Sequence, residues 1–197
     1  MSASPTVAGR SRRSSVRSTA DEQRVRIIAC AVDTFARAGY RATPVADVAD
    51  AAKVSTAYVF RLFDGKLGLF VAAVDDCYDR VTAALIAGAE AVEDPGAHAA
   101  ARLDAMSDAY VALIRDQSLI ALQVHAQSAC DVPEIRDAVR RGIGRIVTAV
   151  TRETGADAAS VQRFLAYGQL CHLIVQAGIG DVDAAWARIV DNGIDHL

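Results

Sequence analysis

The sequence predicts an all-α protein with about nine helices. Of its 197 residues 40 are alanine and only 4 are proline. Alanine is the strongest helix former and proline the strongest helix breaker. Apolar residues also recur at helical intervals, as in Val25, Ile28, Val32 and Phe35. Hydrophobic residues make up 52% of the chain and charged residues 23%, which is typical of a folded protein of one ordinary domain or two small ones.

The first 18 residues differ from the rest. Residues 1–18 are rich in Ser and Arg, contain no acid and show no periodicity, so we expect a disordered basic arm. Its arginines could follow a minor groove or only release counterions. The first helix should begin at Thr19, because Thr19-x-x-Glu22 has the spacing of a capping box, and it should end at Gly39.

Three more helix starts follow closely. Thr43 precedes a proline, which predicts an N-cap with Pro at the first helical position of a short second helix. Ser55 should cap a third short helix, and Asp64 should cap a longer helix that begins near Lys66. Prolines and glycines then divide the remainder into helices. The expected ranges are 66–91, 99–115, 118–129, 133–153, 158–178 and 182–195.

Charge is distributed unevenly along the chain. Residues 1–66 carry 11 Lys or Arg against 6 Asp or Glu, a net charge of +5, whereas residues 67–197 carry 10 against 18, a net charge of −8. A basic N-terminal third on an acidic remainder suits a protein that contacts a polyanion with one end only. Nucleic acid is therefore the leading candidate partner.

Several classes of protein find no support in the sequence. Charged or polar residues interrupt every apolar stretch, so we expect no membrane-spanning helix. The four cysteines are widely spaced, without CxxC pairs or a nearby His, which predicts no metal site and a reducing, cytoplasmic location. We recognise no catalytic motif, and we expect neither enzymatic activity nor a cofactor.

The second and third predicted helices form a candidate helix-turn-helix, ATPVADVADAAKVSTAYVFRLFDGK. By helical spacing, Val54, Val59 and Phe63 should pack inward against Val48, Ala49 and Phe35. The outward positions are then Thr56, Ala57, Tyr58 and Arg61.

The segment RIIACAVDTFARAGYRATPVADVADAAKVSTAYVFRLFDGKLGLF resembles the N-terminal DNA-binding domain of TetR-family transcriptional regulators. The resemblance implies a DNA-binding head over 19–65 and a helical ligand-binding and dimerisation domain over 66–197. It also implies a homodimer on a palindromic operator, which a small-molecule effector releases. Candidate DNA-binding residues are Thr43, Lys53, Ser55, Thr56, Ala57, Tyr58, Arg61 and Lys66. Hydroxyls, helix N-terminal amides and lysine all suit phosphate oxygens.

The sequence departs from the family pattern in the turn and in the third helix. Lys53 stands where the family usually has glycine, which should strain the turn but adds a cation. Ala57-Tyr58 replaces the usual Gly-Thr, and Phe60 replaces a phosphate-binding tyrosine. Because Phe60 has no hydroxyl, we assign that contact to Tyr58. Leu62 also stands where Tyr or His is common.

Beyond Phe70 the resemblance is architectural only. Polar or adaptable residues in apolar surroundings are the candidates for effector contact. They are Met106, Tyr110, Gln123, His125, Gln127 and Tyr167, and His172 is of the same kind. A dimer is expected because one recognition helix reads too few base pairs. Its apolar surface could come from Val161, Phe164, Leu165, Leu173, Ile174, Trp186, Ile189 and Val190.

The function that the sequence favours is a ligand-responsive transcriptional repressor. Two alternatives stay open. One is a small helical enzyme on an apolar substrate, with His125 or His172 as base. The other is an activator or architectural DNA-binding protein without a ligand, which a fully packed C-terminal core would favour.

Overall fold

The structure is a computed structural model in which residues 8–94 and 96–192 are described. Within these residues the chain forms nine α-helices, one short 3-10 helix and no strand, which confirms the predicted fold class. The α-helices are α1 Ala8–Ala42, α2 Val45–Ala51, α3 Thr56–Phe63, α4 Gly65–Glu90, α5 Ala99–Ile114, α6 Gln117–Ser128, α7 Pro133–Thr154, α8 Ala158–Ala177 and α9 Ala185–Val190. The 3-10 helix spans Ile179–Asp181.

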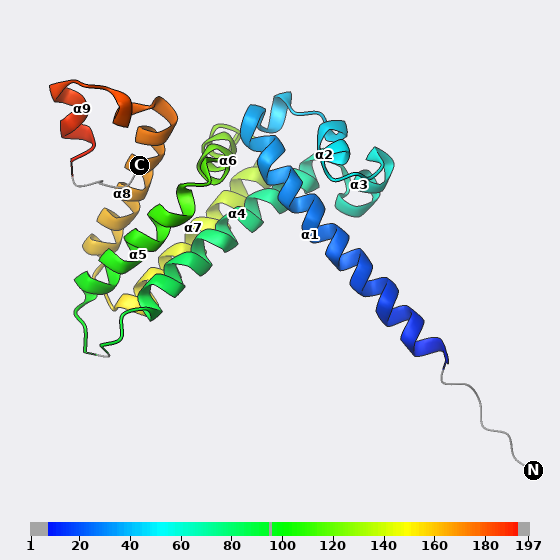
Figure 1. The fold of residues 1–197 in the computed structure, drawn as a ribbon, viewed down its shortest axis with the longest axis horizontal. Coiled ribbons are helices and arrows are strands. Elements are labelled where there is room, and N and C mark those ends of the chain that lie inside the picture. Colours follow the sequence, from blue (N-terminus) through cyan, green and yellow to red (C-terminus); the bar gives the residue numbers. More distant parts are fainter. Residues whose placement is uncertain (1–7, 95, 193–197) are drawn as a thin grey trace, which may run out of the picture.

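Helix α1 is longer than expected, and its N-terminal end projects away from the rest of the molecule (Figure 1). It begins at Ala8, so residues 8–18 are helical where we expected a disordered arm. Extending an existing helix costs far less than nucleating one, which lets arginine, a good helix former, continue the helix outward. The part of the arm before Ala8 lies outside the described residues. At its other end the helical geometry breaks at Gly39, as predicted, where φ is 71°.

Helices α1, α2 and α3 form a small bundle at one end of the molecule. The side chains of Phe35, Val48, Ala49 and Val59 are fully buried, and Phe63 nearly so, within one continuous apolar core. Helical spacing placed these five residues on the inner side together with Val54, which is half-buried and packs against the core. Their burial fixes how α3 is rotated and therefore which of its side chains face outward.

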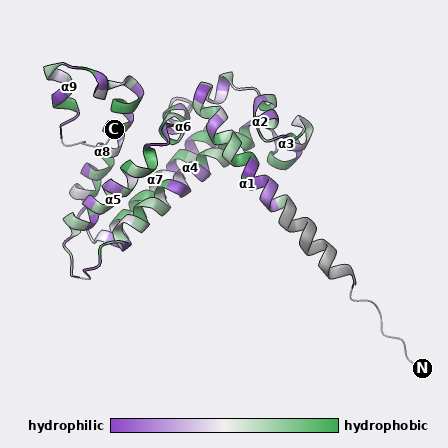
Figure 2. Cartoon of the chain, viewed as in Figure 1, coloured by the Kyte–Doolittle hydropathy of each residue, from purple (hydrophilic) through white to green (hydrophobic). Residues whose placement is uncertain are grey.

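The other helices form a second, larger bundle. Helices α4 and α7 run side by side through the middle of this bundle (Figure 1). Helix α5 packs against α4, and α6 packs against the C-terminal end of α1. Figure 2 shows polar and apolar residues mixed along each helix where hydropathy is drawn. None of the helices in the described ranges is long and apolar enough to cross a membrane.

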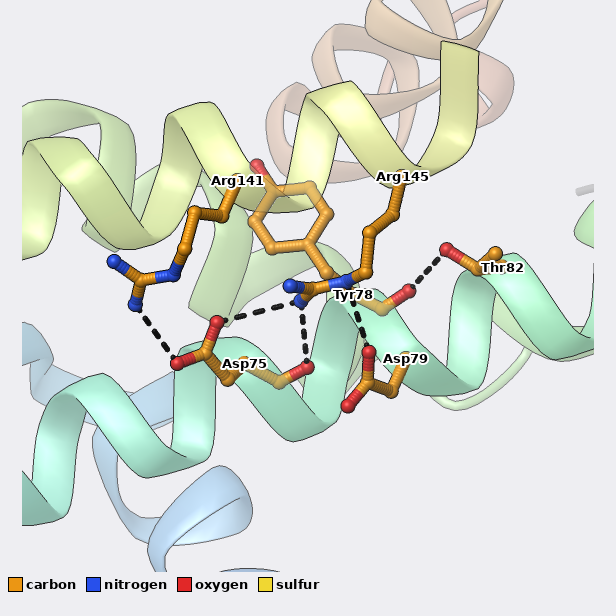
Figure 3. Close-up of polar contacts among 6 residues, drawn as sticks. All are labelled: Asp75, Tyr78, Asp79, Thr82, Arg141 and Arg145. Carbon is orange, nitrogen blue, oxygen red and sulfur yellow. Dashed lines mark hydrogen bonds and ion pairs between the residues drawn. The ribbon is translucent and has the colours of Figure 1, made fainter. Parts of the chain in front are cut away.

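The α4–α7 contact is unusually close at one point. The ring of Tyr78 lies against Gly142, where an added Cβ would be 2.2 Å from the Tyr78 Cγ. Ion pairs surround this point (Figure 3). Arg141 and Arg145 of α7 reach Asp75 of α4 at 3.0 and 3.3 Å, and Arg145 also reaches the neighbouring Asp79 at 2.9 Å. Close packing at Gly142 and these ion pairs thus hold the two central helices together.

Three helix boundaries differ from the sequence expectation. Pro44, not Thr43, is the N-cap of α2, and no side chain caps this helix. Asp64 adopts a left-handed conformation with φ 54° and does not cap α4 through its side chain, because it ends α3. The helix expected over 182–195 begins only at Ala185, as α9, since extended residues at Val182 and Ala184 separate it from the 3-10 helix. The expected residues 193–195 of this helix lie outside the described residues.

Candidate nucleic-acid interface and ligand cavity

Helix α3 begins at the predicted cap. Ser55 is extended, with φ −76° and ψ 145°, and its Oγ accepts a hydrogen bond from the Tyr58 N–H at 3.2 Å. This bond satisfies one of the amides that a helix N-terminus leaves without an intrahelical partner. The cap therefore fixes the first turn of α3, from which the predicted DNA contacts project.

The turn before α3 carries the expected strain. Lys53 adopts a left-handed conformation with φ 55°, which glycine tolerates more readily than lysine. Its side chain is exposed. The turn therefore presents a cation at the surface beside the start of α3.

The outward face of α3 combines an aromatic ring with a cation. Ala57 and Arg61 are exposed, and Thr56 and Tyr58 are half-buried. The Arg61 guanidinium lies 5.3 Å from the centre of the Tyr58 ring. Phe60 is also exposed, so its ring is available for an apolar contact. Such a face can offer hydrogen bonds, positive charge and apolar surface to nucleic acid.

Two other predicted DNA contacts are not free to reach DNA, because one is buried and the other is bonded within the protein. Thr43 is only 2% exposed, and its Oγ1 is buried with no hydrogen-bond partner in the described residues. A phosphate cannot reach this hydroxyl as it stands. The Lys66 Nζ donates to the Arg41 carbonyl at 3.1 Å and lies 5.3 Å from the ring centre of Tyr40. Desolvation by partial burial lowers the pKa of Lys66.

A cavity of about 390 Å³ lies in the C-terminal bundle. This volume is at the lower end of the range for small-molecule sites. Residues from α4, α5, α6, α7 and α8 line it, and most of them are apolar or aromatic. Its principal lining residues are Val81, Leu85, Tyr110, Val111, Gln123, Ile146, Phe164, Leu165, Tyr167 and His172.

A buried polar pair forms part of the cavity wall. The Tyr110 hydroxyl and the His172 Nε2 are 2.7 Å apart. The His172 Nδ1 is buried and has no hydrogen-bond partner in the described part of the chain. Burial lowers the pKa of His172 from 6.5 to about 4, and burial also raises the pKa of the Tyr110 hydroxyl. Both groups are therefore uncharged at neutral pH.

The predicted effector contacts divide into two groups. Tyr110, Gln123 and Tyr167 line the cavity. Met106 is fully buried in the core, outside the lining, and Gln127 bonds Gln169 across α6 and α8 at 3.1 Å.

His125 lies elsewhere, at the joint between the two bundles. Its ring packs so closely on Gly39 that a Cβ there would be 2.7 Å from the His125 Nδ1. His125 is therefore a packing residue between α6 and the end of α1.

The residues predicted to form the dimer interface differ in exposure. Leu173, Trp186 and Ile189 are 55%, 55% and 77% exposed, which is unusual for large apolar side chains. Val161 and Ile174 are buried within the chain, Val190 is half-buried, and Phe164 and Leu165 line the cavity. Only the three exposed residues can therefore supply much apolar surface to a partner.

Another kind of site is not evident. No group of three or more His, Cys, Asp or Glu side chains in 8–94 and 96–192 is placed to hold a metal ion.

Helices α2 and α3, joined by a short turn and with exposed side chains on α3, have the arrangement of a helix-turn-helix, a motif that places its second helix in the major groove of DNA. Residues 27–73 match the family described as bacterial regulatory proteins, tetR family. The sequence resemblance is thus confirmed over these residues. No curated protein matches the sequence.

Solved structures share the fold well beyond this domain. A TetR family transcription regulator from Marinobacter aquaeolei has a TM-score of 0.62 at 19% identity, covering 89% of this chain and 95% of that one. The fatty acid degradation regulator FadR from Bacillus halodurans has a TM-score of 0.63 at 14% identity, covering 89% and 97%. The multidrug binding protein EbrR, solved with imidazole, has a TM-score of 0.60 at 21% identity, covering 86% and 87%. The second bundle thus also has a fold found in TetR-family structures.

Proposed function

We propose that the protein is a homodimeric transcriptional repressor that reads a palindromic operator through α3 and leaves it when a small molecule fills the cavity. The observation that carries this proposal is the outward face of α3. Tyr58 and Arg61 lie together on a helix whose other side is locked into the core, and Lys53 precedes it. The positive charge of residues 1–66 supports binding of a polyanion at this end.

The proposed dimer rests on the exposed apolar residues of α8 and α9. Leu173 on α8, with Trp186 and Ile189 on α9, would be shielded from water in a dimer. A two-fold pair of heads also reads twice as many base pairs as one head, and it matches an inverted repeat.

Helix α6 offers a physical connection between the cavity and the DNA-binding end. Gln123 of α6 lines the cavity, whereas His125 two residues later packs on Gly39 at the end of α1. Asp131, just beyond α6, pairs with Arg41. A ligand that displaces α6 would therefore also shift the chain that leads into α2. Typical allosteric coupling of about 1 to 3 kcal/mol would change operator affinity by about 5-fold to 150-fold.

The alternative functions are less well supported. A cavity of about 390 Å³ argues against a DNA-binding protein whose C-terminal bundle only packs. An enzyme using His172 as base would need that group to accept a proton near neutral pH, but its pKa is about 4. His125, the other candidate base, packs at the joint and not in the cavity.

The proposal is tested by selecting bound fragments from random duplex DNA at moderate salt, without added small molecules. We expect enrichment of an inverted repeat with half-sites about one helical turn apart. Binding that is only salt-sensitive and independent of sequence would contradict a specific repressor and favour the architectural alternative.

A further inference from the structure

The cavity lining has an uneven charge. Among the described residues that line the cavity, Asp104 and Asp108 are the only carboxylates, and none is a lysine or an arginine. His172 adds no positive charge at neutral pH, because burial lowers its pKa to about 4. An anionic ligand would therefore enter without a cation to neutralise it, which is costly in an apolar site.

The carboxylates lie along one face of α5. Asp104, Ser107, Asp108 and Val111 all line the cavity at the i, i+3, i+4 and i+7 spacing of one helical stripe. Asp104, Ser107 and Asp108 are exposed, so they lie at the mouth of the cavity. Asp104 forms no ion pair with any described residue of the chain.

The buried end of the cavity has a different character. Phe164 supplies an apolar ring, and Tyr110 is held by His172. The His172 Nδ1 is buried without a partner in the described residues, and His172 as a whole is only 4% exposed. A buried polar atom of this kind is costly unless it is hydrogen-bonded, so a ligand atom that bonds it would be favoured.

We propose that the cavity selects lipophilic amines, with the ammonium group at Asp104 and the apolar body directed inward against Phe164. Carboxylates of the same shape bind more weakly. The inference deepens the proposed function, on which it rests, by giving the chemical class of the effector. An exposed carboxylate attracts an ammonium group, while the low-dielectric interior accepts the apolar body.

Calorimetry on the full chain without DNA tests the selection, with phenylbutylamine, phenylbutanol and phenylbutyrate as probes. The three differ at the terminal group only. We expect the amine to bind at millimolar concentration or more tightly, and at least about tenfold more tightly than the carboxylate. Equal or tighter binding of the carboxylate, or binding of none of the three, overturns the proposal.

A charge variant tests the position of the ammonium group. Asp104→Asn should weaken amine binding about fivefold and leave the alcohol unchanged, as expected for an exposed charge pair of about 1 kcal/mol. Glu90→Gln is the matched control, because Glu90 is exposed on α4 and does not line the cavity. If Asp104→Asn and Glu90→Gln bind the amine equally, the assignment is wrong.

A steric variant tests the cavity itself. Gly168 lines the cavity, and a Cβ added there meets no atom within 4 Å, so Gly168→Phe can fill space without disturbing the core. This variant should lose amine binding. Gly144→Phe on α7 is the control, since Gly144 is equally open but does not line the cavity. Retained binding in Gly168→Phe would place the amine elsewhere and overturn the proposal.

These measurements are independent of the DNA experiment. A protein that selects an operator but does not prefer the amine refutes this inference and keeps the proposed function. A protein that binds the amine through Asp104 but selects no DNA refutes the proposed function and keeps the assigned site.

Discussion

Replacing Gly142 by alanine should destabilise the protein, although alanine is the better helix former. A Cβ at this position would lie 2.2, 2.3 and 2.7 Å from the Cγ, Cδ2 and Cδ1 atoms of Tyr78. Real Cβ atoms do not approach other atoms so closely, and the Tyr78 ring is almost fully buried. The ring can therefore move only if α4 and α7 separate, which would also stretch the ion pairs of Asp75 with Arg141 and Arg145 (Figure 3).

The magnitude follows from two opposing terms. Alanine favours the helix over glycine by about 1 kcal/mol. Overpacking a filled core costs about 1 to 3 kcal/mol, and this approach is close enough to reach the upper end. Gly142→Ala should thus lower the free energy of unfolding by about 2 kcal/mol.

Gly144→Ala is the matched control on the same helix. A Cβ at Gly144 meets no atom within 4 Å, so only the higher helix propensity of alanine applies. The free energy of unfolding of this variant should therefore rise by about 1 kcal/mol. The two variants should therefore differ by about 3 kcal/mol, or roughly 6 to 12 °C in Tm for a chain of this size.

Thermal unfolding at one fixed protein concentration measures the difference, because the stability of a dimer depends on concentration. Equal Tm values for the two variants would refute the reasoning. They would mean that α4 and α7 are not in close contact at Tyr78.

Three further predictions concern the cap, the buried histidine and the dimer. Ser55→Ala should lower the free energy of unfolding by about 1 kcal/mol in denaturant titration. Ser55→Asp keeps a capping oxygen and should retain most of the stability that the cap contributes. An equal loss of stability in both variants would argue against the cap. Because burial holds the pKa of His172 at about 4 against 6.5, the unfolded chain takes up this proton first as pH falls. The contribution of uncharged His172 to the free energy of unfolding is complete above about pH 6.5, and up to about 3 kcal/mol of it is lost by about pH 4. His172→Gln should therefore flatten the dependence of stability on pH between these values, and an unchanged dependence would contradict the burial of His172. Trp186→Glu should shift the sedimenting species toward monomer, whereas Val25→Glu, which is also exposed but lies on α1, should not; a dimer that survives Trp186→Glu would exclude α9 from the interface.

Much of the fold follows from short-range signals in the sequence. Ser55 caps α3 as predicted, and α1 breaks at Gly39 because glycine readily adopts the positive φ found there. The inner face of α3 also follows from spacing, since Val59 and Phe63 recur at a helical interval.

The candidate sites depend on where helices sit relative to one another, which spacing along one helix does not give. Met106 and Tyr110 are one turn apart on α5, yet only Tyr110 reaches the cavity. Thr43 has the sequence pattern of a cap, but tertiary packing buries its hydroxyl. The stripe of Asp104, Ser107 and Asp108 was not predicted from the sequence, because only the adjoining wall of α8 makes it the mouth of a cavity.

The central claim is that the outward face of α3 reads DNA, and operator affinity of a Tyr58 variant tests it most directly. The selected duplex is titrated with the wild-type protein, Tyr58→Ala and Tyr167→Ala, and Tm is measured for each. We predict that Tyr58→Ala weakens binding at least about tenfold, or about 1.4 kcal/mol, with little change in Tm, because its ring is on the outer face. Tyr167→Ala, an exposed tyrosine on α8, should bind the operator as the wild type does. Equal affinity of Tyr58→Ala and the wild type for the operator would contradict the account.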